Sequence, residues 1–220
     1  MSNLFDKRKT VRRYTDEPVP KDVILDVLRD AQKAPSWANS QPWEVYVATG
    51  ETLERLRKAY LEAYDSQQAP DDRDMPKPKA WPDYLQERMN ASYARVFEQT
   101  GIARDDEKAR AENWRNNFAF FNAPVAVFLC LDRSLTEWST LDVGIYAGNL
   151  MLAATQHGLG STPAASSVSY PHLLREILEI PEHHRIIVGI MMGYEDKDHP
   201  YNRASSIRVP VEETIHFRGL

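Results

Sequence analysis

Apolar residues along the 220-residue chain recur with two different periods, and each period predicts a different kind of element. A spacing of three or four positions is typical of helices that cover a core, and alternating or continuous apolar runs are typical of strands. Helices are predicted over residues 21–34, 51–65, 140–157 and 170–180. Strands are predicted over residues 43–49, 125–131 and 184–194, with a further short one within 158–167. This order predicts an α+β fold, or an α/β fold, in which helices wrap a central sheet.

The region between residues 66 and 115 departs from this pattern. Its first part, 66–84, is rich in Pro, Asp and Lys and lacks an apolar period, which predicts a long exposed loop. The stretch that follows, up to residue 121, is helical in pattern, highly charged and interrupted at Gly101. Two antiparallel helices and one broken helix fit it equally well. We therefore expect a single domain over 1–220, with 66–115 as a helical excursion or lid outside the core.

Composition and charge narrow the class of protein. Apolar residues make up 42% of the chain, enough for a substantial core, and the formal net charge of −5 argues against general nucleic-acid binding. The single cysteine, Cys130, lies in an apolar run and is expected in a core strand. One buried thiol forms no disulfide framework, which is typical of proteins of a reducing compartment. No apolar run reaches the length of a membrane span, and the first residues lack a secretory signal, so we expect a cytoplasmic protein.

The sequence offers no protein nucleophile and no metal centre. No Ser-His-Asp or Cys-His set stands out, and no Cys and His residues have the spacing of zinc ligands. No G-x-G-x-x-G follows the first predicted strand, which argues against a Rossmann dinucleotide site. An enzyme with this sequence would take its chemistry from an organic cofactor.

A run of five cations in seven residues is the first candidate binding feature. Arg8 and Arg12 are four positions apart with Thr10 between them. This arrangement suits a phosphate or another dianion, because guanidinium groups offer paired donors. A solvated basic segment near the N-terminus is the alternative. The run consists of Lys7, Arg8, Lys9, Arg12 and Arg13.

Two loop segments are the next candidates. Between the first helix and the first strand, Ser36, Asn39 and Gln41 surround Trp37, a mixture that suits a flat heteroaromatic ligand with polar edges. A plain helix-to-strand connection is the alternative. The segment 163–166 combines a proline with very small side chains, so a planar ring could approach its backbone closely.

Two further features stand out in the second half of the chain. Gly144, Ala147 and Gly148 cluster on one side of the helix predicted at 140–157, which fits either tight packing inside the chain or a subunit interface. Arg208 is a lone arginine among apolar neighbours near the C-terminus, and we regard it as a fourth candidate binding feature.

Taken together, these stretches resemble one family in their order and spacing. The segments RKTVRRY, APSWANSQPWEVYV, GIYAGNLMLAATQHGLGSTPAA, IIVGIMMGY and IRVPVEE are similar to motifs of the FMN-dependent nitroreductase family. The resemblance covers nearly the whole chain. Within 66–115 and just beyond, the segments YLQERM and TGIARDDEKARAENWRNNFAFFNAPV resemble a subgroup that reduces nitrobenzoate and other nitroaromatic compounds.

The resemblance implies a fold and a site. The fold is an α+β sandwich with a mostly antiparallel sheet, in a homodimer that exchanges C-terminal segments and holds two FMN molecules at its interface. For the flavin phosphate, the resemblance implies Arg8, Lys9, Thr10, Arg12 and Arg208. For the edge of the ring it implies Pro35, Ser36 and Asn39. For the second face it implies Pro163, Ala164, Ala165 and Ser166, with the backbone N–H of Ala165 near flavin N5.

The resemblance also implies an activity. The expected enzyme is an FMN-dependent NAD(P)H oxidoreductase, which takes hydride from NADH or NADPH and passes it through flavin N5 to nitroaromatic or quinone-type acceptors in a ping-pong cycle. Reductive dehalogenation or ene reduction on the same scaffold is the alternative, and a non-enzymatic binding module is a more distant one. Ala165 and Ser166 depart from the family pattern, since one familiar member has Glu-Gly there, and two further positions depart as well. Trp37 stands where a small residue is common and is a candidate contact for a small aromatic substrate, and Ser206 replaces a lysine.

Overall fold

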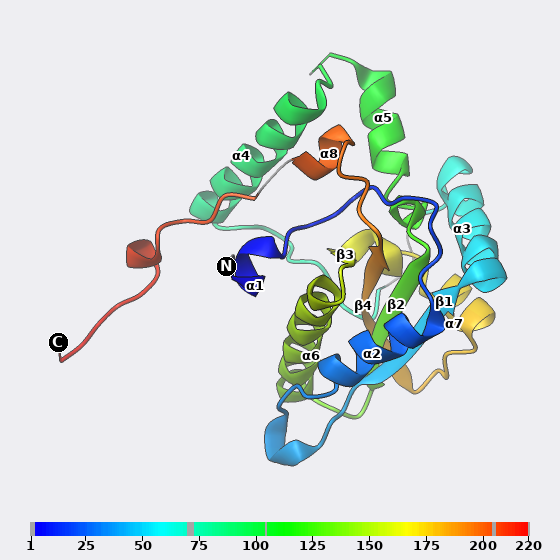
Figure 1. Ribbon diagram of the computed structural model, residues 1–220, viewed down its shortest axis with the longest axis vertical. Coiled ribbons are helices and arrows are strands. Elements are labelled where there is room, and N and C mark those ends of the chain that lie inside the picture. The colour runs from blue at the N-terminus through cyan, green and yellow to red at the C-terminus, as the bar shows by residue number, and fades with distance from the viewer. Residues whose placement is uncertain (1–2, 70–72, 104, 204–205, 220) are drawn as a thin grey trace.

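The computed structural model describes residues 3–69, 73–103, 105–203 and 206–219. At its centre lies a four-stranded sheet in the order β1-β2-β4-β3, with every neighbouring pair antiparallel (Figure 1). The strands are β1 (Glu44–Thr49), β2 (Val125–Asp132), β3 (Gly160–Ala164) and β4 (His184–Gly193). The predicted antiparallel sheet is thus confirmed, and β3 and β1 form its two edges.

Helices cover both faces of the sheet. Successive side chains of a strand point to opposite faces, and β2 is apolar throughout, so it contributes to two separate cores. Val127 and Leu129 pack with α2 (Lys21–Ala31) and α6 (Glu137–Gln156), whereas Phe128 packs on the other face. That second face is covered by α3 (Gly50–Asp65) and α7 (Pro171–Leu178). The α+β sandwich expected from the sequence is therefore confirmed.

Two helix boundaries differ from the predicted ones by three residues, and the others by no more than two. Helix α2 ends at Ala31 rather than at residue 34, because Pro35 disfavours helical backbone in the residue before it and the chain turns into a loop. Helix α6 begins at Glu137, three residues earlier than predicted. Its first turn is mostly polar and exposed, so it carries no apolar period from which the start could be read.

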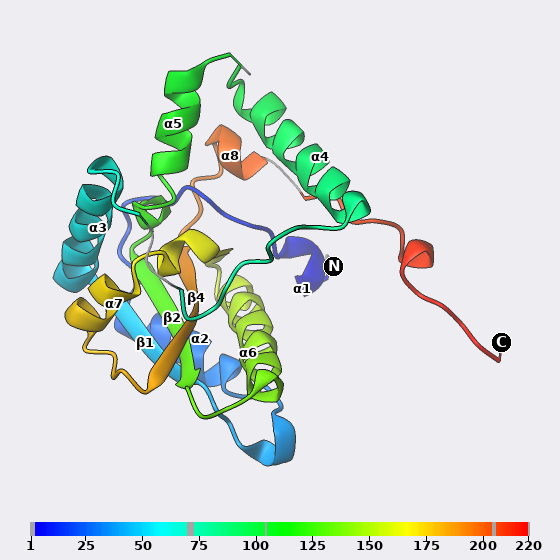
Figure 2. The ribbon, with the colours of Figure 1, turned by 180° about the vertical axis from the view of Figure 1, so that it is seen from behind.

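The excursion forms two separate helices, so the alternative of one broken helix is wrong. Helix α4 (Asp83–Thr100) ends at Gly101, whose φ of 69° is the left-handed conformation that commonly terminates a helix. Helix α5 (Glu107–Arg115) follows and meets α4 at an angle above the short α8 (Pro200–Arg203), as Figure 2 shows. Neither α4 nor α5 buries a residue completely, which agrees with a position outside the core.

The C-terminal tail leads away from the sheet in both views (Figures 1 and 2). It carries one short helical turn, η4 (Val211–Glu213), and Glu213 pairs with Arg88 of α4 at 3.5 Å. Cys130 is fully buried in β2, as the sequence predicted. Among the described residues, no helix is long and apolar enough to cross a membrane.

Candidate functional site

The basic N-terminal segment lies along the free edge of the sheet. It follows the short helix α1 (Leu4–Lys7), and the backbone N–H of Val11 donates to the carbonyl of Ser161 in β3 at 3.0 Å. Thr10 and Ser161 form a parallel bridge at the same place. An edge strand has unpaired backbone groups, and this segment occupies those of β3. Gly160 permits the approach, since a Cβ there would lie 2.6 Å from the Val11 side chain.

The five cations of this segment have different surroundings. Lys9 places its ammonium 2.6 Å from the carboxylate of Glu195, and the Arg13 guanidinium lies over the ring of Tyr201 at 4.7 Å. By contrast, no carboxylate among the described residues lies within ion-pair distance of Arg8 or Arg12.

Arg8 and Arg12 are both half-buried, and the surroundings of Arg12 perturb its charge. These surroundings remove water from the guanidinium, and this desolvation lowers the pKa of Arg12 from its ordinary value. Nearby, the buried hydroxyl of Ser161 has no hydrogen-bond partner among the described residues. A bound anion would satisfy both the desolvated cation of the basic segment and the unpaired hydroxyl of β3 beside it.

The small-residue segment 163–166 consists of the last two residues of β3 and the two residues that follow it. Pro163 and Ala165 are exposed, whereas Ala164 faces the core. At Ala165 the chain enters the 3-10 helix η3 (Ala165–Val168), and the N–H at such a helix start is not used by the helix itself. The Ser167 hydroxyl donates to the Ala164 carbonyl at 2.6 Å, and the buried Tyr60 hydroxyl donates to the Ser167 carbonyl at 2.7 Å. The turn is therefore held in place by buried hydroxyl groups on its core side.

The loop after α2 is a built structure rather than a plain connection. The N–H of Trp37 donates to both carboxylate oxygens of the buried Asp142 in α6, each at 3.2 Å. The N–H of Gln41 donates to the hydroxyl of Ser36 at 2.9 Å. Three non-glycine residues adopt left-handed φ values between 48° and 57°, and such backbone is costly unless its surroundings fix it. These residues are Ala38, Asn39 and Gln41.

The sequence did not reveal that Asp142 of α6 anchors this loop. The available signal was a single acidic position on the apolar face of the helix predicted at 140–157. A carboxylate in such a place needs a donor, and the N–H of Trp37 supplies it across 105 positions of sequence.

Within one chain the predicted site residues fall into separate groups. Figure 1 shows the N-terminal segment and the 35–42 loop at opposite ends of α6. The loop is anchored at Asp142, and the last residue of α6, Gln156, lies about 21 Å farther along the axis at about 1.5 Å per residue. Arg208 is exposed on the C-terminal tail. The structure thus brings together Arg8, Lys9, Thr10, Arg12 and 163–166, but not Pro35, Ser36, Trp37, Asn39 or Arg208.

One face of α6 is apolar and open. Trp138 and Leu141 are more than half exposed, and Trp138 meets Trp37 edge to face with ring centroids 5.2 Å apart. A Cβ built on Gly144 or Gly148 would meet no atom of the described residues within 4 Å. Tight packing inside the chain therefore does not explain the two glycines, although it does account for Ala147 of the same cluster, which is buried in the core.

Comparison with known proteins identifies the family. The model of the nitroreductase family matches residues 6–194, which is most of the chain. The chain belongs to the nitroreductase family. A chloronitrobenzene nitroreductase of Comamonas testosteroni is 34% identical over 99% of this chain and 96% of its own length. A 4-nitrobenzoate reductase of Nocardioides sp. is 33% identical over 96% of this chain and 86% of its own length.

Solved structures agree with this result. The FMN and NADPH-dependent nitroreductase NfnB of Sphigopyxis sp. strain HMH has a TM-score of 0.94 at 28% identity, with 99% of this nitroreductase and 98% of that chain covered. The FMN-dependent nitroreductase NfnB of Mycobacterium smegmatis, solved with NADPH, has a TM-score of 0.91 at 31% identity, with 98% and 96% covered. The predicted family, its nitroaromatic-reducing relatives and the oxidoreductase class are confirmed.

Proposed function

We propose that this nitroreductase binds FMN and transfers electrons from NADH or NADPH to nitroaromatic or quinone-type acceptors. One observation carries the proposal: a half-buried, unpaired Arg12 lies beside the edge strand that leads into the exposed small-residue turn. A cation without a carboxylate next to an open backbone turn suits a planar ring that carries a phosphate. The names of the relatives and the cofactors of the solved structures support the same assignment.

The phosphate is assigned to the basic segment. Arg8 and Arg12 supply the unpaired charges, and Thr10 supplies a hydroxyl between them. Lys9 remains in the set, although its ammonium is already held by Glu195. Arg208 would join this group when the tail folds against a second chain.

The ring is assigned to the turn made by Pro163, Ala164, Ala165 and Ser166. The exposed Pro163 and Ala165 leave its backbone accessible, and the N–H of Ala165 would donate to the reacting edge of the ring. FMN would supply the two-electron chemistry, because hydride transfer is a property of the flavin. The chain's residues hold the ring, donate to it and shield one face from water.

We infer that the functional unit is a homodimer with exchanged C-terminal segments. The 35–39 loop and the basic segment of one chain lie at opposite ends of α6, so neither can complete the other's site. The open apolar face of α6 offers a surface for a second copy, and small residues at Gly144 and Gly148 allow helices to approach closely. In that arrangement Pro35, Ser36 and Asn39 of each chain would reach the ring edge held by the other.

A small aromatic acceptor would bind beside the same edge of the flavin ring, next to Trp37. Trp37 is exposed, its backbone N–H is bonded to Asp142 and its ring contacts Trp138, so its indole is available to stack on an aromatic substrate. We further propose a cytoplasmic location, which a single buried cysteine supports because it is typical of reducing compartments.

An absorption spectrum of the purified protein tests the proposal. A yellow protein should lose its visible absorbance when NADH or NADPH is added without oxygen, and it should recover that absorbance when a nitroarene or a quinone follows. The Arg12→Ala variant should retain less flavin after gel filtration. The Arg29→Ala variant serves as a control, because Arg29 pairs with Asp26 on the surface of α2 and with no other carboxylate among the described residues. A protein that stays colourless with added FMN would refute the proposal.

A further inference from the structure

Asn202 is a buried polar residue with no role in the site described above. It lies in α8 and is 1% exposed. Its side-chain amide donates to the carbonyls of Arg13 at 2.7 Å and Asp196 at 2.8 Å, and its side-chain oxygen accepts the backbone N–H of Arg12 at 2.8 Å. Both amide protons and the carbonyl oxygen are therefore in use.

The backbone around Asn202 holds the same segment at further points. Its carbonyl accepts the ammonium of Lys9 at 2.9 Å. The ring of the neighbouring Tyr201 lies beneath the Arg13 guanidinium, and the N–H of Asp196 donates to the Arg13 carbonyl at 3.2 Å. Residues 194–202 thus grip the basic segment from the side opposite to β3.

Arg12 depends on these contacts, because its one other hydrogen bond among the described residues comes from its neighbour: the Arg13 guanidinium donates to the Arg12 carbonyl at 2.9 Å. The side chain of Arg12 has no ion-pair partner among the described residues, so the direction of the guanidinium follows from where its backbone is held. Val11 is pinned to β3 on one side, and Asn202 fixes Arg12 itself on the other. The Asn202 side chain has almost no exposed surface, so it cannot act by touching a ligand.

We propose that Asn202 is a positioning residue that holds the Arg12 backbone so that its guanidinium binds the phosphate of FMN. This inference rests on the proposed function, since it concerns the phosphate half of that site. The inference also assigns a role to α8, which places one polar side chain against the backbone of the N-terminal segment, 190 positions away in sequence.

The test compares two flavins that differ only in the phosphate. Full-length protein freed of flavin is titrated with FMN and with riboflavin, and quenching of flavin fluorescence reports each Kd. Asn202→Ala should raise the Kd for FMN at least tenfold, the size expected when one hydrogen bond to a charged group is lost. The Kd for riboflavin should stay within twofold, because riboflavin does not use Arg12.

Two further variants keep the test decisive. Asn202→Leu has a similar branched shape, removes all three side-chain hydrogen bonds and adds no charge beside the phosphate site. It should also weaken FMN and spare riboflavin, and it replaces the alanine variant if that one does not fold. Asn117→Ala is the matched control, because Asn117 also donates to two backbone carbonyls but lies after α5, and it should change neither Kd.

The outcomes separate this inference from the proposed function. If the Asn202 variants weaken both flavins by the same factor, or weaken neither, the residue does not position Arg12 and the inference is overturned. If the unmodified protein itself does not prefer FMN to riboflavin, the assigned phosphate site is wrong and both proposals fall together. A preference for FMN that disappears in both Asn202 variants supports both.

Discussion

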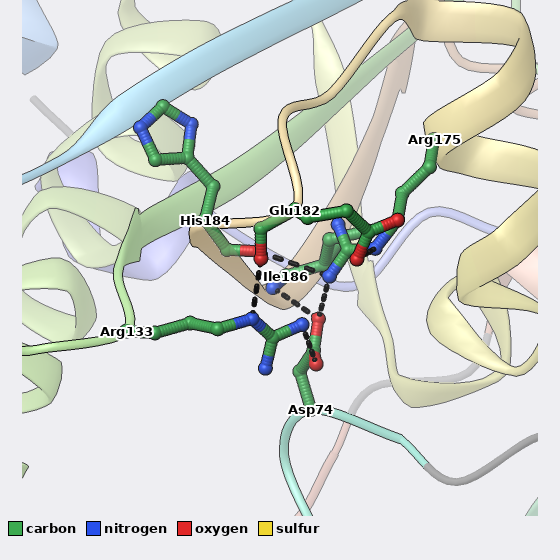
Figure 3. Close-up of polar contacts among 6 residues, drawn as sticks. All are labelled: Asp74, Arg133, Arg175, Glu182, His184 and Ile186. Carbon is green, nitrogen blue, oxygen red and sulfur yellow. Dashed lines mark hydrogen bonds and ion pairs between the residues drawn. The ribbon is translucent and has the colours of Figure 1, made fainter.

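Asp74 ties the beginning of the excursion to the sheet, and its removal should destabilise the whole protein. Figure 3 shows its carboxylate between two guanidinium groups. One oxygen accepts a bond from Arg133 at 2.6 Å, and the other accepts bonds from Arg175 at 2.6 Å and from the N–H of Ile186 at 2.9 Å. Ile186 lies near the start of β4, so the segment that follows α3 is fixed to that end of the sheet.

The expected cost follows from burial. The side chains of Asp74 and Arg175 are 8% and 11% exposed, and removal of one member of a buried ion pair costs about 3–5 kcal/mol. Arg175 would keep its bond to the His184 carbonyl and its pairing with Glu182, and the Arg133 pair is too exposed to add much. We therefore expect Asp74→Ala to lower the free energy of unfolding by about 3 kcal/mol, at the lower end of that range.

Urea denaturation followed by circular dichroism measures this loss at fixed protein concentration. A slope of about 3 kcal/mol per molar urea, the upper range for chains of moderate size, converts the loss into a midpoint about 1 M lower. Asp65→Ala is the matched control, because Asp65 accepts two bonds from Arg115 at 2.8 and 2.6 Å but the two side chains are 49% and 44% exposed. Equal midpoints for the two variants would refute the reasoning, since burial is the difference that should separate them.

Three further outcomes follow from the structure. Gly148→Leu should leave the melting temperature of the isolated chain unchanged or higher, since its Cβ meets no described atom, but it should lower the mass measured by sedimentation if this face joins two chains. A dimer that persists would exclude the face. Burial raises the pKa of the Cys130 thiol to about 12, so iodoacetamide at pH 9 should label it only after denaturation; equal labelling rates for folded and denatured protein would contradict its burial. Gly189→Ala would collide with the Ser167 hydroxyl that holds the Ala164 carbonyl, so it should cost about 1–3 kcal/mol in urea and weaken FMN binding. Normal values of both would show that the turn tolerates the shift.

The sheet and its covering helices could be predicted because burial imposes periods on the sequence. The apolar run of β2 contributes alternate side chains to two cores, and the run of β4 is buried in the same way, so both strands are visible as continuous apolar stretches. Helix α6 was recognisable from its apolar face, but its polar first turn was not. The limit is therefore physical, because a residue that is not buried leaves no period to read.

The polar contacts of the site could not be predicted in the same way. Asn202 reaches Arg12 across 190 positions, and Asp142 reaches Trp37 across 105. A single polar residue in an apolar stretch shows that a partner is needed, but it does not show which one. Likewise the left-handed backbone at Ala38 and Asn39 has no glycine to announce it, since the surrounding hydrogen bonds fix it instead.

The separation of the site within one chain has a thermodynamic consequence. The basic segment, with the turn at 163–166, and the 35–39 loop are each held rigidly, yet they lie at opposite ends of α6. If each half belongs to a different site of a homodimer, a flavin bound between two chains contacts both of them. Binding and association are then linked, and each strengthens the other by the same free energy. The open face of α6 would not need to be strongly adhesive by itself, which agrees with the small residues at Gly144 and Gly148 in its middle.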